Sequence, residues 1–567
     1  MEQMPWMRSY PADLCWDEKL PQISVLKLLD IATLRWPNRP AVDFMGCKIT
    51  YRELSALVDR ATVGLQQLGV GPGVQVGLYL PNVPHFLISF FAILRAGAVV
   101  VNYSPLDART TLAHKIEDSE TDVLITLDLA SLYPNMQALL SSTRLRTLVV
   151  GSLNEFTTEP GKTRATMQKD GLLSDVTYGP TCIPFAQLMA NDGRYLSSCP
   201  GSSVDTVAVL QYTGGTTGLP KGAMLTHGSI TAAVAQVCSV HVDNDRLLHE
   251  GSERILVALP LFHVYAMITD MLLGIRIGAE LVLMLRFDPE KVLQEISERK
   301  ITCFPGVPTM FSALMAHPRV GDYDLKSLKV CGSGGAPLPI ELLQRFEALA
   351  GCPLSEGWGM TETTAGGTFT PRQAAHRPGS CGLPMPGLAM KFVDINDPSS
   401  PVPLGASGEL VVAGPNLLKG YWRNEQATLD SFTADGFFRT GDIGYMDEDG
   451  YIYIVDRTKD MLLCGGFNVY PRVIEEAIYA HPGVEEVIVI GIDDAYRGQA
   501  PMAFVKLRPG QGSLSLDQLR EFLRDRLGKH EMIHALEIRD ELPKTAVGKL
   551  SKLMLRDEVR DRSGAGA

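Results

Sequence analysis

The sequence predicts an α/β protein: a large N-terminal domain of parallel-sheet subdomains with a β-rich subdomain, then a small α+β C-terminal domain. Short apolar runs of strand length alternate with segments whose apolar residues recur at helical spacing. From Gly408 onward strand-like patterns become more frequent, and a separate α/β pattern begins beyond Asp456. We therefore expect one domain over residues 1–456 and a second over residues 457–567.

Strands and helices alternate through the first half of the chain. Apolar residues have helical spacing over residues 50–68 and 84–94, whereas residues 74–80 and 99–102 are apolar runs of strand length. Further strand-like runs occur at residues 123–125, 147–150, 255–258 and 280–284. This order is typical of βαβ units and therefore of parallel sheets.

The other segments differ in pattern. Residues 152–200 are polar and rich in Gly, Ser, Thr and Pro, so we expect an irregular insertion or a long surface connection. Short strands are expected at residues 409–413 and 451–455. In the C-terminal domain we expect helices near 473–479 and 516–527, with strands near 484–490 and 502–507.

Composition excludes several classes of protein. A chain of 567 residues is too long for one hydrophobic core. Its net charge of −12 argues against a nucleic acid held by a general basic field. Ten cysteines are scattered without a Cys-x-x-Cys pair, so neither a zinc site nor a disulfide framework is expected, and reduced thiols favour the cytoplasm.

No targeting or membrane-spanning segment is expected. The N-terminus, Met-Glu-Gln-Met-Pro-Trp, lacks a basic stretch followed by an apolar one. The most apolar run, residues 86–101, contains Arg95 and is too short to cross a bilayer. We therefore interpret it as a buried helix followed by a strand.

The most informative segment is residues 209–222, Val-Leu-Gln-Tyr-Thr-Gly-Gly-Thr-Thr-Gly-Leu-Pro-Lys-Gly. Its glycines let the backbone approach a ligand, and its N–H groups, threonine hydroxyls and Lys221 together suit the phosphates of a nucleotide. It is not the common P-loop, because Pro220 precedes the lysine and Gly222 follows it. The alternative is a flexible surface loop. Two Thr-Gly clusters directly after a buried-strand pattern favour phosphate binding.

Residues 213–222 resemble the phosphate loop of the adenylate-forming superfamily, which includes acyl-CoA synthetases, peptide-synthetase adenylation domains and luciferases. Six other segments resemble signature motifs of that superfamily, in the expected order. They are Leu-Pro-Leu-Phe-His at 259–263, Gly-Gly-Ala-Pro at 334–337, Gly-Trp-Gly-Met-Thr-Glu at 357–362, Arg-Thr-Gly-Asp at 439–442, Asp-Arg-Thr-Lys-Asp at 456–460 and Pro-Lys-Thr-Ala-Val-Gly-Lys at 543–549. The resemblance extends from about residue 25 to residue 560.

The resemblance implies an AMP-forming acid–thiol ligase with ATP, Mg²⁺ and coenzyme A as cofactor and co-substrates. A carboxylate attacks the α-phosphate of ATP, which gives an acyl-adenylate and pyrophosphate, and the thiol of coenzyme A then displaces AMP. The nucleotide-binding residues that it implies are Thr213, Gly214, Gly215, Thr216, Thr217, Gly218, Lys221, Gly335, Ala336, Pro337, Gly357, Trp358, Gly359, Thr361, Asp442 and Arg457.

Each implied role suits its residue type. Glu362 offers a hard oxygen ligand for Mg²⁺, and Thr361 can donate to a phosphate. Trp358, where many relatives carry tyrosine, has a flat face for adenine. Asp442 can accept from both ribose hydroxyls, and Arg457 can add a ribose or phosphate contact. Taken singly, each of these is also common as a core, turn or surface residue.

The implied catalytic set is Lys549, Glu362, Thr361 and Lys221. By resemblance, Lys549 enters the active site and bridges the substrate carboxylate to the α-phosphate. Composition alone would make it an ordinary solvated lysine. The resemblance also makes Lys549 a substrate for a lysine acetyltransferase, and neutralising its charge would stop the first step.

The small domain is expected to move. The resemblance places a hinge at Lys459, and rotation about it would withdraw the catalytic lysine and bring Gly465 and Gly466 to a thiol tunnel. The alternative for these two glycines is a simple hairpin turn. Relatives often have Tyr-Lys-x-Pro before the last strand, whereas residues 528–532 read Gly-Lys-His-Glu-Met, a departure that concerns contacts with coenzyme A.

The expected acyl site is apolar. The resemblance places His263, Val264, Val307 and Gly366 near the acid substrate, with Ala266, Met267 and Gly367 beside them. No arginine stands among them to pair a second carboxylate, so we favour a medium- or long-chain fatty acid. The chain looks most similar to bacterial fatty acyl-CoA ligases.

Other functions stay open on the sequence alone. They are a ligase for an aromatic or dicarboxylic acid, an adenylating enzyme that passes the acyl group to a carrier protein or to oxygen, and a catalytically silent scaffold. The resemblance also allows a homodimer and peripheral contact with the inner membrane. No nucleic-acid partner is expected.

Overall fold

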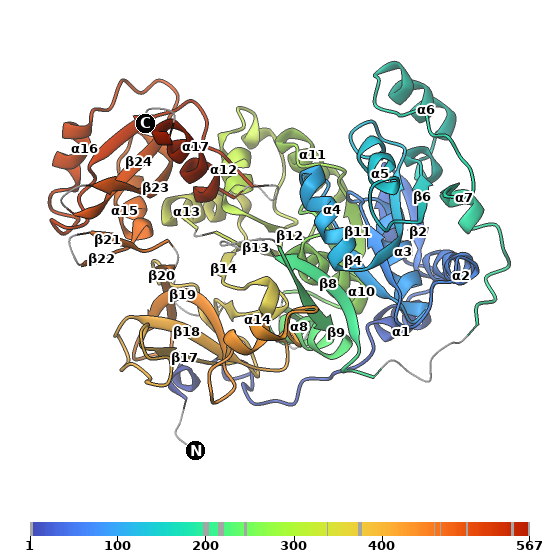
Figure 1. Cartoon of the computed structure of the whole chain (residues 1–567), viewed down its shortest axis with the longest axis horizontal. Coiled ribbons are helices and arrows are strands. Elements are labelled where there is room, and N and C mark those ends of the chain that lie inside the picture. The colour runs from blue at the N-terminus through green and yellow to red at the C-terminus, as the bar shows by residue number, and fades with distance from the viewer. Residues whose placement is uncertain are drawn as a thin grey trace.

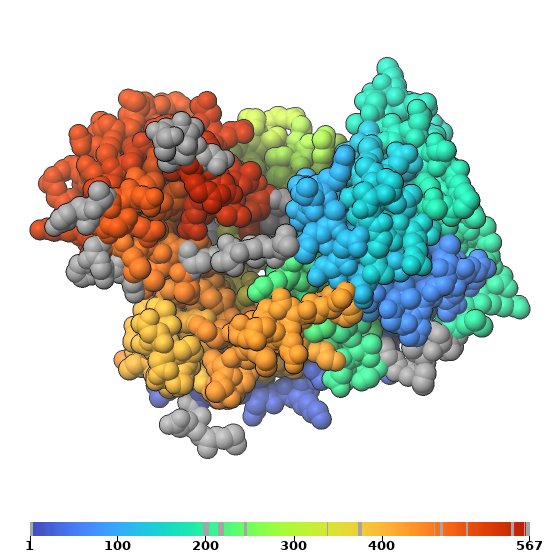
Figure 2. Space-filling view, in the orientation of Figure 1, coloured from blue at the N-terminus to red at the C-terminus, as the bar shows by residue number. Residues whose placement is uncertain are grey.

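The computed structural model describes residues 4–196, 203–213, 220–242, 247–336, 338–371, 377–458, 460–464, 467–494, 497–545 and 549–564. Two seven-stranded sheets, a four-stranded sheet and a five-stranded sheet make up its main layers. In Figure 1 the C-terminal elements group at the upper left, and the four-stranded sheet lies below them. The seven-stranded sheet formed by residues 75–226 extends from the centre to the right. The space-filling view shows the C-terminal residues as a lobe beside a larger body (Figure 2).

The first sheet has the order β7-β6-β5-β3-β4-β8-β9 and is parallel except for the hairpin between β8 and β9. Its central strands are buried and rich in Val, Leu and Ile, as both-side coverage of a parallel sheet requires. The strands are β3 (Gln75–Leu78), β4 (Val99–Asn102), β5 (Thr121–Leu127), β6 (Thr147–Gly151), β7 (Cys182–Pro184), β8 (Val207–Thr213) and β9 (Lys221–Thr226). The helices of this part are α2 (Tyr51–Gln67), α3 (Pro84–Arg95), α4 (Arg109–Asp118), α5 (Tyr133–Leu140), α6 (Pro160–Lys169), α7 (Phe185–Leu188) and α8 (His227–His241).

The second sheet has the order β14-β13-β12-β10-β11-β1-β2 and includes the N-terminal hairpin, whose β1 lies parallel to β11. Its strands are β1 (Pro40–Phe44), β2 (Cys47–Thr50), β10 (Arg254–Val257), β11 (Glu280–Leu283), β12 (Cys303–Gly306), β13 (Val330–Gly334) and β14 (Leu354–Gly357). Its helices are α1 (Leu26–Arg35), α9 (Val264–Ala266), α10 (Leu273–Ile277), α11 (Pro289–Arg299), α12 (Pro308–Ala316) and α13 (Ile340–Ala350), with a π-helical turn at Met267–Leu272.

The rest of the chain is richer in strands, as predicted from Gly408 onward, and most of these strands pair antiparallel. It begins with β15 (Thr368–Phe369), β16 (Leu383–Pro384), β17 (Ala389–Val393), β18 (Gly408–Ala413), α14 (Glu425–Asp430), β19 (Phe438–Met446) and β20 (Ile452–Arg457). The C-terminal elements are β21 (Leu462–Cys464), β22 (Phe467–Val469), α15 (Pro471–Tyr479), β23 (Val484–Asp494), β24 (Gly498–Leu507), α16 (Leu516–Leu523), β25 (Ala535–Ile538) and α17 (Lys552–Gly564). Short 3₁₀ turns lie at Pro5–Arg8, Leu153–Phe156, Val320–Asp322 and Thr361–Thr363.

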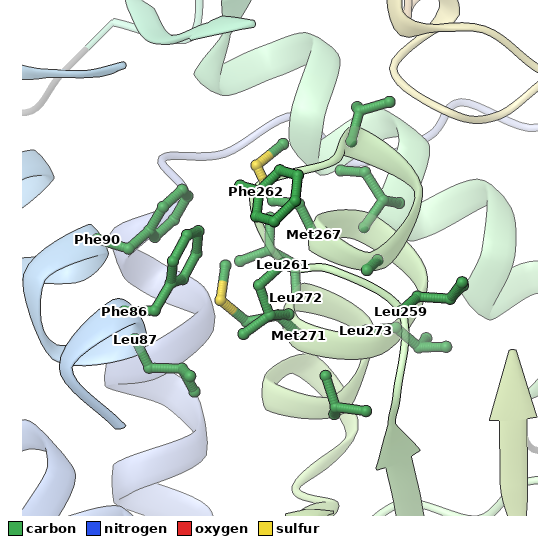
Figure 3. Packing of buried hydrophobic residues seen from close by; sticks show 14 of the residues in the cluster. Phe86, Leu87, Phe90, Leu259, Leu261, Phe262, Met267, Met271, Leu272 and Leu273 are labelled. Carbon is green, nitrogen blue, oxygen red and sulfur yellow. The ribbon is translucent and has the colours of Figure 1, made fainter. Parts of the chain in front are cut away.

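One hydrophobic core joins the two large sheets. It extends from Trp6 to Ile452, whereas separate clusters serve the residues from Leu462 to Leu555. Figure 3 shows Phe86 and Phe90 of α3 beside side chains of the 259–273 segment. Because this apolar contact joins elements of both large sheets, it positions the edges that border the site described below.

The polar segment at 152–200 is more regular than predicted. Part of it forms α6 and the edge strand β7, which pairs with β6. The strand is short and ends in Pro184, and α6 has Met167 as its buried residue, so neither presents a clear period. Within the described residues no helix is both long enough and apolar enough to cross a membrane.

Candidate active site

A cavity of about 1600 Å³ lies where the two large sheets, the four-stranded sheet and the C-terminal domain meet. Its wall includes the ends of β8, β12, β13 and β14, the segment after β10, and the loop before α14. Arg457 from the last strand of the four-stranded sheet and Lys549 from the C-terminal domain also line it. The cavity thus brings together most of the described residues that the sequence marked.

Asp442 is the centre of a small charged cluster. It is buried on β19, opposite Arg457 in the register of β19 with β20. The Nε of Arg457 lies 3.0 Å from its Oδ1, and the indole Nε1 of Trp358 donates to its Oδ2 at 2.7 Å. The Asp442 carboxylate raises the pKa of the Arg457 guanidinium, so Arg457 keeps its positive charge.

Glycines in the cavity wall allow close approaches that a side chain would prevent. Gly335 follows β13 with φ of +77°, a conformation that glycine adopts at low cost. A methyl group added at Gly359 would lie 1.9 Å from the carbonyl oxygen of Ala365, so the two backbones touch there. Gly357 also lines the cavity, Ala336 follows Gly335 in the chain, and Pro337 lies outside the described residues.

Lys549 of the C-terminal domain reaches Gly335 in the cavity wall. A methyl group on Gly335 would lie 2.5 Å from its Nζ, which shows how closely the lysine approaches the end of β13. Burial, and after it the positive charge of Arg457, lowers the pKa of Lys549 to about 8, while Asp442 acts in the opposite sense. The cationic lysine is therefore held in an environment that would favour an added anion.

Glu362 lies deeper in the cavity wall and is held by a tyrosine. The hydroxyl of Tyr421 donates to its Oε1 at 2.9 Å, and the Nζ of Lys221 lies 5.1 Å from the centre of the same tyrosine ring. Burial raises the pKa of Glu362. The hydrogen bond from Tyr421 and the positive charge of Arg457 lower this pKa, but by less than burial raises it. Thr361, next in the chain, also lines the cavity.

A single buried carboxylate suits Mg²⁺, which usually binds one or two carboxylates together with substrate phosphates. Glu362 has one oxygen engaged by Tyr421 and fits this pattern. Within the described residues no group of three or more His, Cys, Asp and Glu side chains could hold a metal by itself. Any metal here would therefore depend on phosphate oxygens as well.

The predicted phosphate loop borders the same cavity at both of its ends. Thr213 ends β8 and pairs with Lys221, which begins β9. Gly214, Gly215, Thr216, Thr217 and Gly218 lie outside the described residues. The hinge Lys459 and the tunnel glycines Gly465 and Gly466 also lie outside them.

His263 is neutral at physiological pH. Burial, and after it the charge of Lys549, lowers the pKa of His263 to about 3. Its Nδ1 accepts from the backbone N–H of Tyr265 at 3.3 Å, so its proton is on Nε2. The ring can therefore donate one hydrogen bond into the cavity.

The remaining wall near His263 is mainly apolar. Val264, Val307 and Gly366, which were expected near the acid substrate, line the cavity together with Ile268, Leu273, Cys303 and Val330. The ring of Tyr265 lies against β13, since a methyl group on Gly334 would be 3.0 Å from its Cζ. Sequence reasoning missed Tyr265 and Tyr421. The aromatic residues that follow Gly420 were a signal for Tyr421, but nothing local linked it to Glu362, 59 residues away.

The fold and this cavity together are those of an adenylate-forming enzyme. The chain belongs to the AMP-binding enzyme family: residues 29–422 match that family, and residues 473–549 match the AMP-binding enzyme C-terminal domain.

Relatives of known name cover almost the whole chain. It is 36% identical over 560 residues to a long-chain-fatty-acid–CoA ligase of Bacillus subtilis, covering 98% of each chain. It is 37% identical over 536 residues to a feruloyl-CoA synthase of Amycolatopsis, covering 93% of this chain and 96% of the other. Among solved structures, the anthranilate CoA ligase AuaEII in complex with anthranoyl-AMP superposes with a TM-score of 0.84 at 26% identity, covering 96% of this chain and 99% of that one.

Proposed function

We propose that this protein is an ATP-dependent acyl-CoA ligase whose acid substrate is a medium- or long-chain fatty acid. The observation that carries the proposal is Lys549, which lies in the cavity beside the ion pair of Asp442 and Arg457. A relative named for long-chain fatty acids and the apolar wall around Val264 and Val307 support the choice of acid.

In the first step a carboxylate oxygen of the acid forms a bond to the α-phosphorus of ATP, and pyrophosphate leaves. Two anions meet, so positive charge and positioning should supply most of the rate enhancement. We assign the bridge between carboxylate and α-phosphate to Lys549 and the neutral hydrogen-bond donor beside the carboxylate to His263. Mg²⁺ held by Glu362 and the phosphates would neutralise charge on the leaving pyrophosphate.

In the second step the sulfur of coenzyme A bonds to the acyl carbon and AMP leaves with the electrons of the C–O bond. We propose that the C-terminal domain, residues 457–567, first turns about Lys459 and withdraws Lys549. The separation of the hydrophobic clusters between Ile452 and Leu462 supports a division of the chain there. In the turned arrangement Gly465 and Gly466 would border the thiol.

Pyrophosphate release measured over a panel of fatty, aromatic and dicarboxylic acids, with and without coenzyme A, tests this function. We expect release with fatty acids and formation of AMP and acyl-CoA when coenzyme A is added. The feruloyl-CoA synthase relative makes aromatic acids the main competitor. Selective turnover of an aromatic acid would overturn the proposal that the substrate is a fatty acid. Absence of turnover with every acid would overturn the proposed ligase reaction.

Three finer properties also remain proposals. Acetylation of Lys549 would remove the charge that the first step needs, and the pKa of about 8 leaves part of this amine unprotonated and nucleophilic near neutral pH.

Pairing of two copies and peripheral contact with a membrane are properties that the family resemblance allows. Light scattering and flotation with phospholipid vesicles measure them directly.

A further inference from the structure

We propose that Trp358 is a positioning residue for the ribose of ATP: its indole N–H orients the Asp442 carboxylate that binds the sugar. This inference rests on the proposed function, because it assigns a second role to a residue in the nucleotide site. Trp358 was expected only to offer its face to adenine. In addition, its Nε1 donates a hydrogen bond to Asp442 Oδ2 at 2.7 Å, and the two residues are 84 positions apart in the sequence.

The backbone and ring of Trp358 are both held in place. Its backbone N–H donates to the Thr368 hydroxyl at 2.8 Å, and its carbonyl accepts from the Thr368 N–H at 2.9 Å. The indole lies directly on Gly367, where an added methyl group would be 2.3 Å from Cε3. With the backbone and one face of the ring fixed, the N–H has a defined direction.

Counting acceptor sites shows what this direction achieves. A carboxylate has about four lone-pair sites on its two oxygens. Arg457 uses one on Oδ1 and Trp358 uses one on Oδ2. One site is left on each oxygen, which matches the two adjacent hydroxyls of a ribose. Since each oxygen is held by a donor from a different side, the carboxylate cannot turn freely about its Cβ–Cγ bond.

The chemistry of the indole makes this role specific to tryptophan. Its N–H is a donor only and lies on the side edge of the ring. A tyrosine has its hydroxyl at the far tip of the ring, and this hydroxyl can also accept. A phenylalanine keeps a flat apolar face without any donor. Replacing the N–H therefore separates the contact with Asp442 from stacking on the base.

The test compares ATP with 2′-deoxy-ATP and 3′-deoxy-ATP in acid-dependent pyrophosphate release. The variants are Trp358→Phe and the protein with 3-benzothienylalanine at position 358, whose sulfur replaces the indole N–H at nearly unchanged shape. We expect KM for ATP to rise about tenfold or more with a smaller change in kcat, because a charge-assisted bond is lost. KM for the deoxynucleotides should rise less, so discrimination between ribose and deoxyribose should fall.

Asp442→Asn and the double variant with Trp358→Phe complete a cycle. If Trp358 acts through the carboxylate, the double variant should be little worse for ATP than Asp442→Asn alone. Trp16→Phe is the matched control, because it removes an indole N–H that donates to the Leu388 carbonyl away from the cavity. This control variant should leave KM for ATP, for 2′-deoxy-ATP and for 3′-deoxy-ATP unchanged.

The outcomes distinguish failure of the role assigned to Trp358 from failure of the proposed ligase function. Equal increases of KM for ATP and both deoxynucleotides would show that Trp358 only contacts the base, and additive effects in the cycle would show that it acts independently of Asp442. Either result overturns the inference while the ligase function stands. Absence of pyrophosphate release by the unaltered protein with every acid would instead overturn the proposed function, and the inference with it.

Discussion

At the scale of single residues, the site depends on how burial changes charge. Lys549 and His263 are both basic groups whose pKa burial lowers, but the outcomes differ. With a pKa of about 8, Lys549 is mainly protonated near neutral pH, whereas His263, with a pKa of about 3, is neutral. One residue therefore supplies charge and the other a neutral donor.

This difference predicts the pH dependence of the first step. Below about pH 8 Lys549 is mainly cationic, and above it the lysine loses the charge that bridges two anions. We expect kcat/KM for ATP in pyrophosphate release to fall as pH rises above 8, because that parameter reports the free enzyme. Bound ATP adds negative charge and raises the pKa of Lys549, so kcat should fall only at higher pH.

Lys549→Arg provides the comparison for the pH profile. A guanidinium stays protonated throughout this range, so the variant should be slower but should lack the alkaline fall. His263, already neutral, should add no limb between pH 6 and pH 9. The same alkaline fall in Lys549→Arg would assign the titration to another group.

At the scale of elements, close backbone approaches hold the site together. β14, the turn after it and β15 meet where Gly359 and Gly367 lie against Ala365 and Trp358. Such contacts leave no room for a side chain, and here they bring a strand of the second large sheet against the start of the β-rich part. The position of the indole is therefore a property of this junction and not of Trp358 alone.

Gly367→Ala tests the junction. Its methyl group would lie 2.3 Å from Cε3 and 2.4 Å from the carbonyl oxygen of Trp358, so the indole or the backbone must move. We expect a loss of about 1–3 kcal/mol in stability, seen as a lower melting temperature, together with a raised KM for ATP. Gly321→Ala is the control, since no atom outside its neighbours lies within 4 Å of the added methyl group. Unchanged ATP binding in Gly367→Ala would contradict a tight junction.

At the scale of the whole molecule, the two domains contribute different parts of one cavity. Lys549 comes from the C-terminal domain, and Arg457, which pairs with the buried Asp442 of β19, comes from β20. Lys552 of the C-terminal domain lies 3.2 Å from Glu475 of the same domain and 3.9 Å from Asp456, the last residue before it. Lys549 lines the cavity in this arrangement, which is the position that the proposed cycle gives it for the adenylation step.

Lys549→Ala tests whether the two steps use different arrangements. We expect acyl-adenylate formation to fall about 100-fold or more, because a charge aimed at the transition state is lost. Attack of coenzyme A on supplied acyl-adenylate should be largely retained, because Lys549 is withdrawn in that step. Rapid-quench measurement of the two half-reactions checks this, with Lys169→Ala, an exposed position on α6 outside the cavity wall, as control. Equal loss of both steps would contradict the proposed cycle.

Local patterns in the sequence predicted much of this molecule. Helix α2 shows apolar residues at helical spacing and begins with a capping box between Thr50 and Glu53. Buried parallel strands such as β5 appear as apolar runs. Such features depend on neighbours in the chain, so one sequence is enough to find them. The C-terminal helix α17 and the edge strand β7 were missed, because α17 is largely polar and β7 is too short to show a period.

The sequence by itself determined the fold class, the order of the motifs and the residue types of the site, because spacing and side-chain chemistry are local properties. Only the tertiary structure decided which of these residues meet. Residues far apart in the chain are joined by the pairing of β1 with β11 and by two hydrogen bonds. One of these runs from Trp358 to Asp442 and the other from Tyr421 to Glu362. Contacts of this kind, like the lowered pKa of Lys549, arise from packing and burial, and no local pattern in the chain records which distant partner a side chain will find.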